Sequence, residues 1–449
     1  MVPPGRSGTP TGRRSARAVV SRSLSQRLAS IFSAVRSKRD YGRNAATDLA
    51  CTGLGFASGI LVARGLGPAG RGQLAAAMMW PGLAAVLFSF GLQHAFAYAS
   101  GAGWCSAESL HRLAVRYSVL VGVPVALLFV LACPYLYRES FPNALWIPAA
   151  FACSIPFTFY SGFLMPIYQG RGAFARWNWA KILRSGAWTA AIGLLVALGA
   201  ATVFRALVAQ IVVMVILGAY LALGLKALGS ARDDQPAPLR RLLGYGFAVY
   251  ASGLAYMVNQ QLDQLCLSLY VAPDQLGQYA AAVTVSGMLL FVPGVVGPIV
   301  FSRMAISARE EAGSGAHRAE ALLVGTALLV PSGVVLAVLG PWVVRILYGA
   351  AFAEAGRLLW VLGPAAVFLG LGNILADILR GSGKPMLATY GILVGAVATI
   401  GGLAYALPRY GIWGAAWVSL VAYVIMAIGQ GVLAWKARGP SRVETPVAV

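Results

Sequence analysis

Lys181 and Arg184 lie three residues apart inside an apolar stretch, and their types and spacing suit the binding of a phosphate group. Residues at positions i and i+3 share one face of a helix, so the two cations point the same way. An arginine guanidinium stays charged in a dry environment and binds two phosphate oxygens at once. The alternative is that both side chains extend to lipid headgroups at the membrane edge. Arg112 and Arg116 repeat the pattern, and for them we favour the headgroup contact.

A run of polar residues surrounds Asp263 inside another apolar stretch, namely Asn259, Gln260, Gln261 and Gln264. A charge within a membrane span costs about 2.5 to 3.5 kcal/mol on insertion scales, so such residues face a protein interior or a cavity. We expect the run to line a cavity, where Asp263 binds a coupling proton or sodium ion, pairs with an arginine or contacts sugar hydroxyls. The alternative is a network of hydrogen bonds between helices with a purely structural role.

No pattern in the sequence is typical of a catalytic or metal site. Asp377 and Arg380 are spaced for a local ion pair. The five cysteines are far apart and lack the paired spacing of metal or redox sites. We therefore expect no catalytic residues, no metal ion, no cofactor and no enzyme activity.

The helices that must position these residues are about twelve apolar stretches. Hydrophobic residues make up 59% of the chain and charged residues 11%, against roughly 25% charged in soluble domains. A span needs about 20 apolar residues. The composition predicts an all-α polytopic membrane protein with spans near 46–64, 74–97, 115–136, 144–167, 178–199, 203–225, 243–270, 278–301, 321–344, 357–379, 386–406 and 411–435.

The net charge of +21 follows membrane topology rather than nucleic-acid binding. With the N-terminus in the cytosol, 28 of the 35 Lys and Arg residues fall on the inner side of the predicted spans. Basic loops stay in the cytoplasm, so this bias predicts a bacterial inner-membrane protein with both termini cytoplasmic. No nucleic-acid partner is expected.

An internal repeat divides the chain. Pro68, Gly72 and Gln73 reappear 205 residues later as Pro273, Gly277 and Gln278. A fainter echo, after the fourth span of each half, pairs Gly170 and Gly172 with Gly381 and Gly383. Because each half holds six spans, the repeats are parallel, as in transporters that bind substrate between two halves. The expected parts are a disordered basic cytosolic tail (1–43), a six-helix lobe (44–225), a solvent-exposed linker (226–242), a second six-helix lobe (243–437) and a cytosolic tail (438–449).

Several short motifs carry a family resemblance. They are the turn from Gly65 to Gly72, Leu276-Gly277-Gln278-Tyr279 after the Asp263 helix, Ile346-Leu347-Tyr348-Gly349 before Phe352, and Arg380-Gly381-Ser382-Gly383-Lys384-Pro385. In order and spacing, residues 44–436 resemble the polysaccharide-biosynthesis flippases of the multidrug, oligosaccharidyl-lipid and polysaccharide exporter superfamily. The resemblance implies two pseudo-symmetric six-helix lobes in a V that work by alternating access.

The same resemblance implies a function. The family moves undecaprenyl-pyrophosphate-linked oligosaccharide from the inner to the outer leaflet during exopolysaccharide, capsule or O-antigen biosynthesis. By analogy, Arg184, Lys181 and Arg116 become candidate pyrophosphate contacts, and Asp263, Asn259, Gln260 and Gln264 candidate cavity-lining or ion-coupling residues. The partners implied are the lipid-linked substrate and membrane lipids, with a coupling proton or sodium ion and the polymerase machinery as further options.

Two other functions stay open. A drug or organic-cation antiporter of the same superfamily would need acids in its cleft, whereas basic residues prevail within these spans. A membrane glycan polymerase or ligase would need a large external loop with paired carboxylates, which the predicted loops do not offer. The long basic tail departs from the family pattern. Twelve spans are two fewer than the fourteen typical of lipid II flippases.

Overall fold

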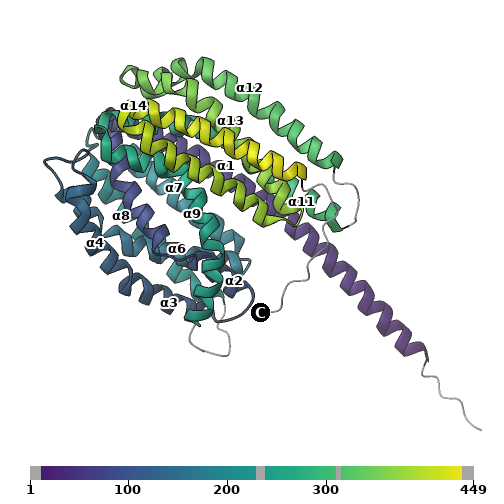
Figure 1. The fold of residues 1–449 in the computed structure, drawn as a ribbon. Coiled ribbons are helices and arrows are strands. Elements are labelled where there is room, and N and C mark those ends of the chain that lie inside the picture. Colours follow the sequence, from purple (N-terminus) through teal and green to yellow (C-terminus); the bar gives the residue numbers. More distant parts are fainter. Residues whose placement is uncertain (1–11, 229–237, 310–314, 437–449) are drawn as a thin grey trace, which may run out of the picture. The chain divides into compact units, whose positions relative to one another are not determined.

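The computed structural model describes residues 12–228, 238–309 and 315–436, and every regular element within them is a helix (Figure 1). The α-helices of the first half are α1 Gly12–Leu87, α2 Leu92–Gly101, α3 Ala107–Leu120, α4 Gly122–Leu136, α5 Trp146–Phe151, α6 Ser154–Gly170, α7 Phe174–Ala197 and α8 Val203–Leu225. Those of the second half are α9 Leu239–Tyr270, α10 Pro273–Ser286, α11 Phe291–Arg309, α12 Gly315–Tyr348, α13 Ala353–Gly381 and α14 Pro385–Lys436. Short 3-10 helices occur at Lys226–Leu228 (η1), Gly287–Leu290 (η2) and Ala350–Phe352 (η3).

The chain divides into two compact units, residues 1–48 and 49–449. In the first unit α1 begins at Gly12, whereas the composition predicts a disordered tail over residues 1–43. The physical reason is that residues 13–43 hold Arg, Ala, Leu and Ser but no proline, and these residue types tolerate a helix. The prolines of this segment all precede Gly12. The structure therefore differs from the prediction over residues 12–43.

Nine helical segments among the described residues are long and apolar enough to cross a membrane. Two of these segments, Gly42–Leu87 and Pro385–Lys436, each contain one residue with non-helical backbone, Gly67 and Gly411. Gly67 falls between the predicted spans 46–64 and 74–97, and Gly411 is the first residue of the predicted span 411–435. Helix α9, which carries the polar run, is not among the nine. Each of the twelve predicted stretches overlaps a helix of the structure. The number of membrane crossings, twelve, stays a prediction.

Some spans are interrupted where the sequence predicts continuity. The stretch 74–97 breaks between α1 and α2, where Phe90 and Gly91 have φ of 46° and 72°. The stretch 115–136 is divided between α3 and α4, and the stretch 278–301 by η2. Apolar residues flank each interruption, so hydropathy does not reveal it.

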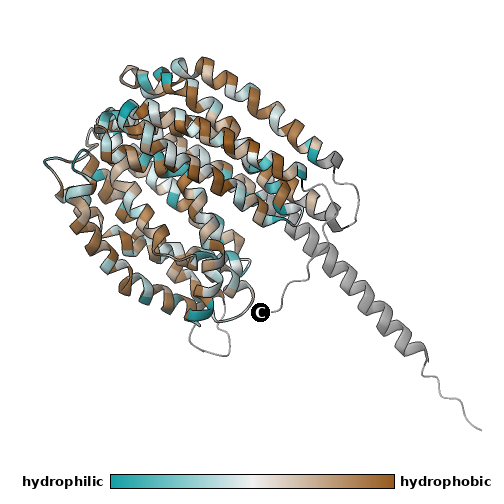
Figure 2. Cartoon of the chain, in the orientation of Figure 1, coloured by the Kyte–Doolittle hydropathy of each residue, from teal (hydrophilic) through white to brown (hydrophobic). Residues whose placement is uncertain are grey.

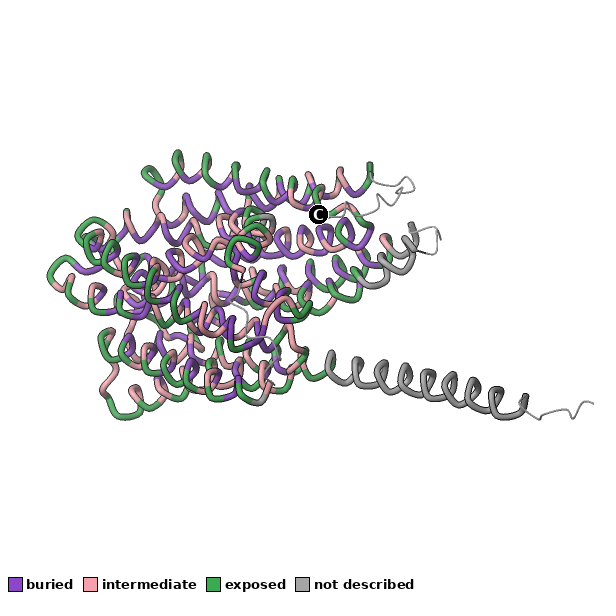
Figure 3. Tube along the Cα trace, turned by 90° about the horizontal axis from the view of Figure 1, so that it is seen from below, coloured by how far each residue is buried: buried purple, intermediate pink, exposed green. Residues whose placement is uncertain are grey.

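Apolar residues cover the outside of the second unit as well as its interior (Figure 2). Leu131 and Leu223 are each 80% exposed and Val338 is 69% exposed, while buried residues gather between the helices (Figure 3). Hydrocarbon accepts such side chains at no cost, so the pattern fits a lipid-facing surface. Helix α13 packs against both α12 and α14 (Figure 1) and is buried along most of its length.

The fainter repeat has a structural meaning. Gly172 and Gly383, with φ of 68° and 75°, lie just beyond the ends of α6 and α13, in the left-handed conformation that often ends helices. Gly170 packs against the backbone of α2 and Gly381 against the backbone of α11. The two glycine pairs therefore occupy equivalent places in the two halves.

The predicted linker and C-terminal tail are mostly outside the described residues. The prediction of a solvent-exposed hinge rests on residues 229–237, and the tail on 438–449, neither of which the structure describes. On either side of the linker, η1 ends at Leu228 and α9 begins at Leu239. We call the end of the bundle near these two residues the linker end.

Candidate functional site

Three adjoining cavities run from the first half of the bundle to the second. Their volumes are about 500 Å³ for the N-terminal pocket, 530 Å³ for the central pocket and 520 Å³ for the C-terminal pocket. Met78 and Gly82 line both the N-terminal and the central pocket, and Tyr256 lines both the central and the C-terminal pocket. A ligand bound in the central pocket would therefore contact both halves.

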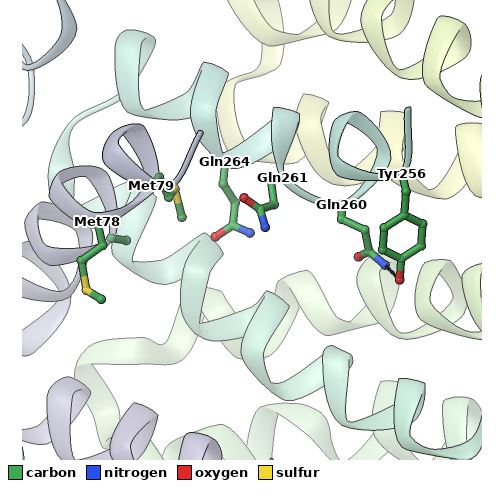
Figure 4. Close-up of a pocket in the computed structure, with 8 residues that line it drawn as sticks. Met78, Met79, Tyr256, Gln260, Gln261 and Gln264 are labelled. Atoms are coloured by element: carbon green, nitrogen blue, oxygen red, sulfur yellow. Dashed lines mark hydrogen bonds between the residues drawn. The ribbon is translucent and has the colours of Figure 1, made fainter. Parts of the chain in front are cut away.

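The central pocket pairs methionines with glutamines. Met78 and Met79 approach it from α1, and Gln260, Gln261 and Gln264 project from α9 (Figure 4). The Gln260 amide donates a hydrogen bond to the Tyr256 hydroxyl at 2.9 Å. Amide groups donate and accept hydrogen bonds without carrying charge, and methionine adapts to irregular shapes. This lining suits a polar, uncharged ligand such as a sugar.

The N-terminal pocket contains a cation. Arg184 lines it from α7 together with Trp177 and Trp188, seven residues before and four residues after it, on one helix face. Among the described residues, no hydrogen bond or ion pair joins the exposed Arg184 side chain to the protein. Three amide side chains from three other helices also line the pocket, Gln93 of α2, Gln169 of α6 and Gln210 of α8. The pocket thus combines a charge available to an anion with aromatic faces and amides.

The other two candidate cations lie differently. The Lys181 ammonium lies 3.6 Å from the centroid of the Trp177 ring, a cation–π geometry, and Trp177 itself lines the N-terminal pocket. Arg116 is exposed on α3 and does not line any of the three pockets. Their roles as pyrophosphate contacts stay predictions.

Asp263 is inside the helix packing rather than on a pocket wall. Its side chain is 4% exposed and accepts hydrogen bonds from the Tyr279 hydroxyl at 2.5 Å and the Ser419 hydroxyl at 3.3 Å. The backbone N–H of Gln264 also donates to it, at 2.7 Å. These bonds join α9, α10 and α14, so Asp263 is held by three helices.

Asn259, one turn before Asp263, is also in the packing. It is 2% exposed, and its amide donates to the Ile392 carbonyl at 2.9 Å and accepts from the Thr399 hydroxyl at 3.3 Å. The Tyr423 hydroxyl donates to the Asn259 carbonyl at 2.6 Å. The polar run therefore has two faces, one that bonds to neighbouring helices and one, with Gln260 and Gln264, that lines the central pocket.

The C-terminal pocket contains the predicted ion pair. Arg380 and Asp377 are 3.1 Å apart on α13, which confirms the pairing expected from their spacing. Asn373 of the same helix and His94 of α2 line the pocket with them. This pocket contains both signs of charge, whereas, of the residues that the structure describes, Arg184 is the one charged residue that lines the N-terminal pocket.

The sequence predictions missed several residues that line the N-terminal pocket, among them Trp177, Trp188, Gln169 and Gln210. Gln210 carried a usable signal, because an amide inside the apolar stretch 203–225 calls for the same explanation as Asp263. The tryptophans gave no such signal, since aromatic residues are common in spans.

Comparison with known proteins agrees with this arrangement. A family model described as "Polysaccharide biosynthesis protein" matches residues 43–304, more than half of the chain. An uncharacterised membrane protein of Methanocaldococcus jannaschii is 25% identical over 196 residues, 43% of this chain and 38% of that protein. The match thus spans well under two thirds of that relative.

Two solved structures share the fold. One is the inward-facing conformation of a multidrug resistance MATE family transporter of the MOP superfamily, with TM-score 0.71, 16% identity and coverage of 88% of this chain and 96% of the other. The second is the lipid II flippase MurJ in an inward closed conformation, with TM-score 0.71, 14% identity and 86% coverage of each chain. At this identity the likeness shows the fold, and the chain is an all-α, multi-pass membrane protein.

Proposed function

The chain belongs to the polysaccharide biosynthesis protein family, and we propose that it translocates an undecaprenyl-pyrophosphate-linked oligosaccharide across the bacterial cytoplasmic membrane. Membrane flippases and transporters share its fold. In this proposal both termini are cytoplasmic, and the substrate enters from the inner leaflet and leaves to the outer one. The products would serve exopolysaccharide, capsule or O-antigen synthesis.

One observation carries the proposal, namely the composition of the N-terminal pocket. Arg184 offers the charge and fork geometry that bind a pyrophosphate. The amides of Gln93, Gln169 and Gln210 can exchange hydrogen bonds with sugar hydroxyls. The faces of Trp177 and Trp188 can pack on the C–H faces of sugar rings. An anionic, sugar-bearing ligand uses all three features.

The membrane potential favours this direction of transport. Moving two uncompensated negative charges out of an inside-negative cell is favourable by about 4.6 kcal/mol per 100 mV. The potential alone therefore suffices to drive export, and a coupling ion is optional. If a proton or sodium ion is exchanged, Asp263 remains our candidate, together with the hydroxyls that bond to it.

A drug or organic-cation antiporter is the second candidate function. It is supported by the likeness to a multidrug resistance MATE transporter and by Asp377, an acid that lines the C-terminal pocket. Arg380 already neutralises that acid at 3.1 Å. We rank this function second because Arg184, the cation in the N-terminal pocket, has no such partner within the part of the chain that the structure describes.

The two candidates are separated by thermal stabilisation of the purified protein. We expect an undecaprenyl-pyrophosphate glycan to raise the melting temperature of the wild type and of Arg205→Ala, but not of Arg184→Ala. Arg205 is a matched control because it is exposed at the start of α8 and donates to the Ala200 carbonyl at 2.9 Å. A response to a lipophilic organic cation alone would reject the flippase in favour of the antiporter.

A further inference from the structure

The two turns that carry the internal repeat, Pro68–Gly72 and Pro273–Gly277, pack directly against each other, and we call this the repeat-turn contact. A Cβ added to the glycine that ends either turn would collide with the carbonyl oxygen of the proline that begins the other. The distances would be 1.7 Å for Gly72 and 1.9 Å for Gly277. Real Cβ atoms do not come this close, so only glycine at both positions allows this backbone approach. The contact joins the two halves at the end of the bundle opposite the linker end.

Arg71 lies within this contact. It is 6% exposed and belongs to the first half of the chain, yet most of its bonds reach the second half. Its guanidinium donates to the Thr284 hydroxyl at 2.8 Å and to the Ala280 carbonyl at 3.2 Å. It also lies 5.2 Å from the centroid of the Tyr348 ring. Its remaining hydrogen bond goes to the Gly59 carbonyl, at 2.5 Å in its own half.

The guanidinium of Arg71 makes hydrogen bonds to the protein, but within the described residues no acidic side chain neutralises its charge. In the described part of the chain its hydrogen-bond acceptors are two carbonyls and a hydroxyl, and none is a carboxylate. Its Nε and the Tyr348 hydroxyl are buried and have no hydrogen-bond partner among the described residues. A charge buried in a membrane protein is costly and is usually functional. The repeat does not require it, because the equivalent position 205 residues later is Leu276.

Arg71 and Arg184 lie at different depths of the bundle. The part of α1 before the break at Gly67 runs side by side with α7 in the same direction, since Thr189 donates to the Leu54 carbonyl at 3.0 Å and Gly65 packs against Val196. Because the two helices run in the same direction, the level of a residue along one helix axis can be compared with the level of a residue on the other.

Arg184 precedes Thr189 by five residues and so lies nearer the linker end. Gly59, which binds the Arg71 guanidinium, follows Leu54 by five residues and lies nearer the repeat-turn contact. At about 1.5 Å per residue, the two levels are separated by about 15 Å along the helix axes. The two arginines are therefore staggered along the path from one end of the bundle to the other.

We propose that Arg71 is a second anion site, which binds the pyrophosphate part of the substrate after the repeat-turn contact opens. This inference rests on the proposed function. Separation of the halves takes Thr284, Ala280 and Tyr348 away from the guanidinium and frees its N–H donors for phosphate oxygens. Arg184 then receives the headgroup on the linker side, and Arg71 receives it before release on the opposite side.

The test opens the contact and removes the first site. In an Arg184→Gln background the closed protein should bind undecaprenyl pyrophosphate at least tenfold more weakly than the wild type, whereas Gly72→Ala, which forces the turns apart, should restore binding. That restored binding should weaken at least tenfold when Arg71→Gln is added. Arg64→Gln is the matched control, because the exposed Arg64 also crosses between the halves, to the carbonyls of Leu347 and Ile346.

The outcomes separate this inference from the proposed function. If wild-type protein does not bind the probe, the proposed function fails. If the wild type binds through Arg184 but the opened variant binds equally with and without Arg71, only the second site is rejected. Equal binding of phosphatidylglycerol vesicles would identify a bilayer phosphate rather than the pyrophosphate headgroup as the ligand, and would also overturn the proposal.

A second variant guards against misfolding. Gly277→Ala introduces the same collision from the other half and should restore binding in the same Arg71-dependent way. If both alanine variants elute as aggregates, the proposal is tested instead by the translocation rates of two single variants of Arg71 that keep both glycines. Arg71→Lys should retain most of the rate and Arg71→Gln should lose at least tenfold, with melting temperatures matched. Equal rates for the two variants would reject the site.

Discussion

Two charged residues inside the bundle, Arg184 and Asp263, are held in opposite ways. Arg184 is exposed to the N-terminal pocket, and no hydrogen bond or ion pair ties it to the described residues. Asp263 is 4% exposed and accepts hydrogen bonds from Tyr279 and Ser419. The one charge is available to a ligand, and the other is already satisfied by the protein.

This difference separates binding from stability. When a buried carboxyl group accepts hydrogen bonds from neighbouring side chains, its removal leaves those donors buried without a partner, which destabilises the fold. A charge on a cavity wall costs little to remove, but it contributes to the affinity for an anion. Truncation of Asp263 should therefore change the stability of the fold, and truncation of Arg184 the affinity for substrate.

The largest effect is expected from Asp263→Ala. The hydroxyls of Tyr279 and Ser419 would lose their shared acceptor, and the free energy of unfolding should fall by about 3 kcal/mol. Chemical denaturation in detergent measures this loss. Glu139→Ala is the control, because Glu139 pairs with Arg138 on the surface and should change stability by about 0.5 kcal/mol or less. Wild-type stability of Asp263→Ala would contradict a structural network.

Arg184→Gln should behave in the opposite way. We expect the affinity for undecaprenyl pyrophosphate to fall at least tenfold, about 1.4 kcal/mol, with the free energy of unfolding unchanged. Arg184→Lys keeps the charge but loses the fork, so its loss should be smaller. Titration of the purified variants checks both values. A loss of stability without a loss of affinity would remove Arg184 from the binding site.

Tyr279→Phe sharpens the contrast on the Asp263 side. It removes one of the two hydroxyl donors, and stability should fall by about 1 kcal/mol. Tyr270→Phe, at a residue 61% exposed, is the control. Translocation should continue in both variants. A translocation rate that loses its dependence on proton or sodium gradients in Tyr279→Phe alone would assign ion coupling to this network instead.

The smallest effect is expected from Gln210→Leu in the N-terminal pocket. The leucine keeps the volume but removes the amide, so binding of the glycan-bearing lipid should weaken by a few-fold while binding of undecaprenyl pyrophosphate stays the same. Val212→Leu, at an exposed position of the same helix, should change neither. Equal weakening for both ligands would place Gln210 away from the sugar.

Much of the fold follows from patterns that the sequence shows openly. Apolar stretches of about 20 residues predict the helical membrane segments, and the repeat of Pro68 and Gly72 as Pro273 and Gly277 marks equivalent places in the two halves. The contact between those turns was not predicted, although parallel repeats related by an axis would bring equivalent turns together there. The interruption at Phe90 was not predictable from hydropathy, because apolar residues surround it.

The site was less predictable, because its parts are distant in the sequence. Gln93, Gln169 and Gln210 meet only when α2, α6 and α8 pack around one pocket. Asp263 stood out as a charge within a span, but its partner Ser419 is 156 residues away. The sequence could place Asp263 within a helix, but only the packing of α9 against α10 and α14 shows that its side chain faces other helices rather than the pocket.

Translocation of a fluorescent undecaprenyl-pyrophosphate glycan in proteoliposomes tests the flippase directly. We expect wild-type protein and Arg205→Ala to move the lipid between leaflets far faster than protein-free vesicles, and Arg184→Ala to do so at least ten times more slowly. Transfer at the protein-free rate by the wild type, or equal rates for the wild type and Arg184→Ala, would contradict the proposal.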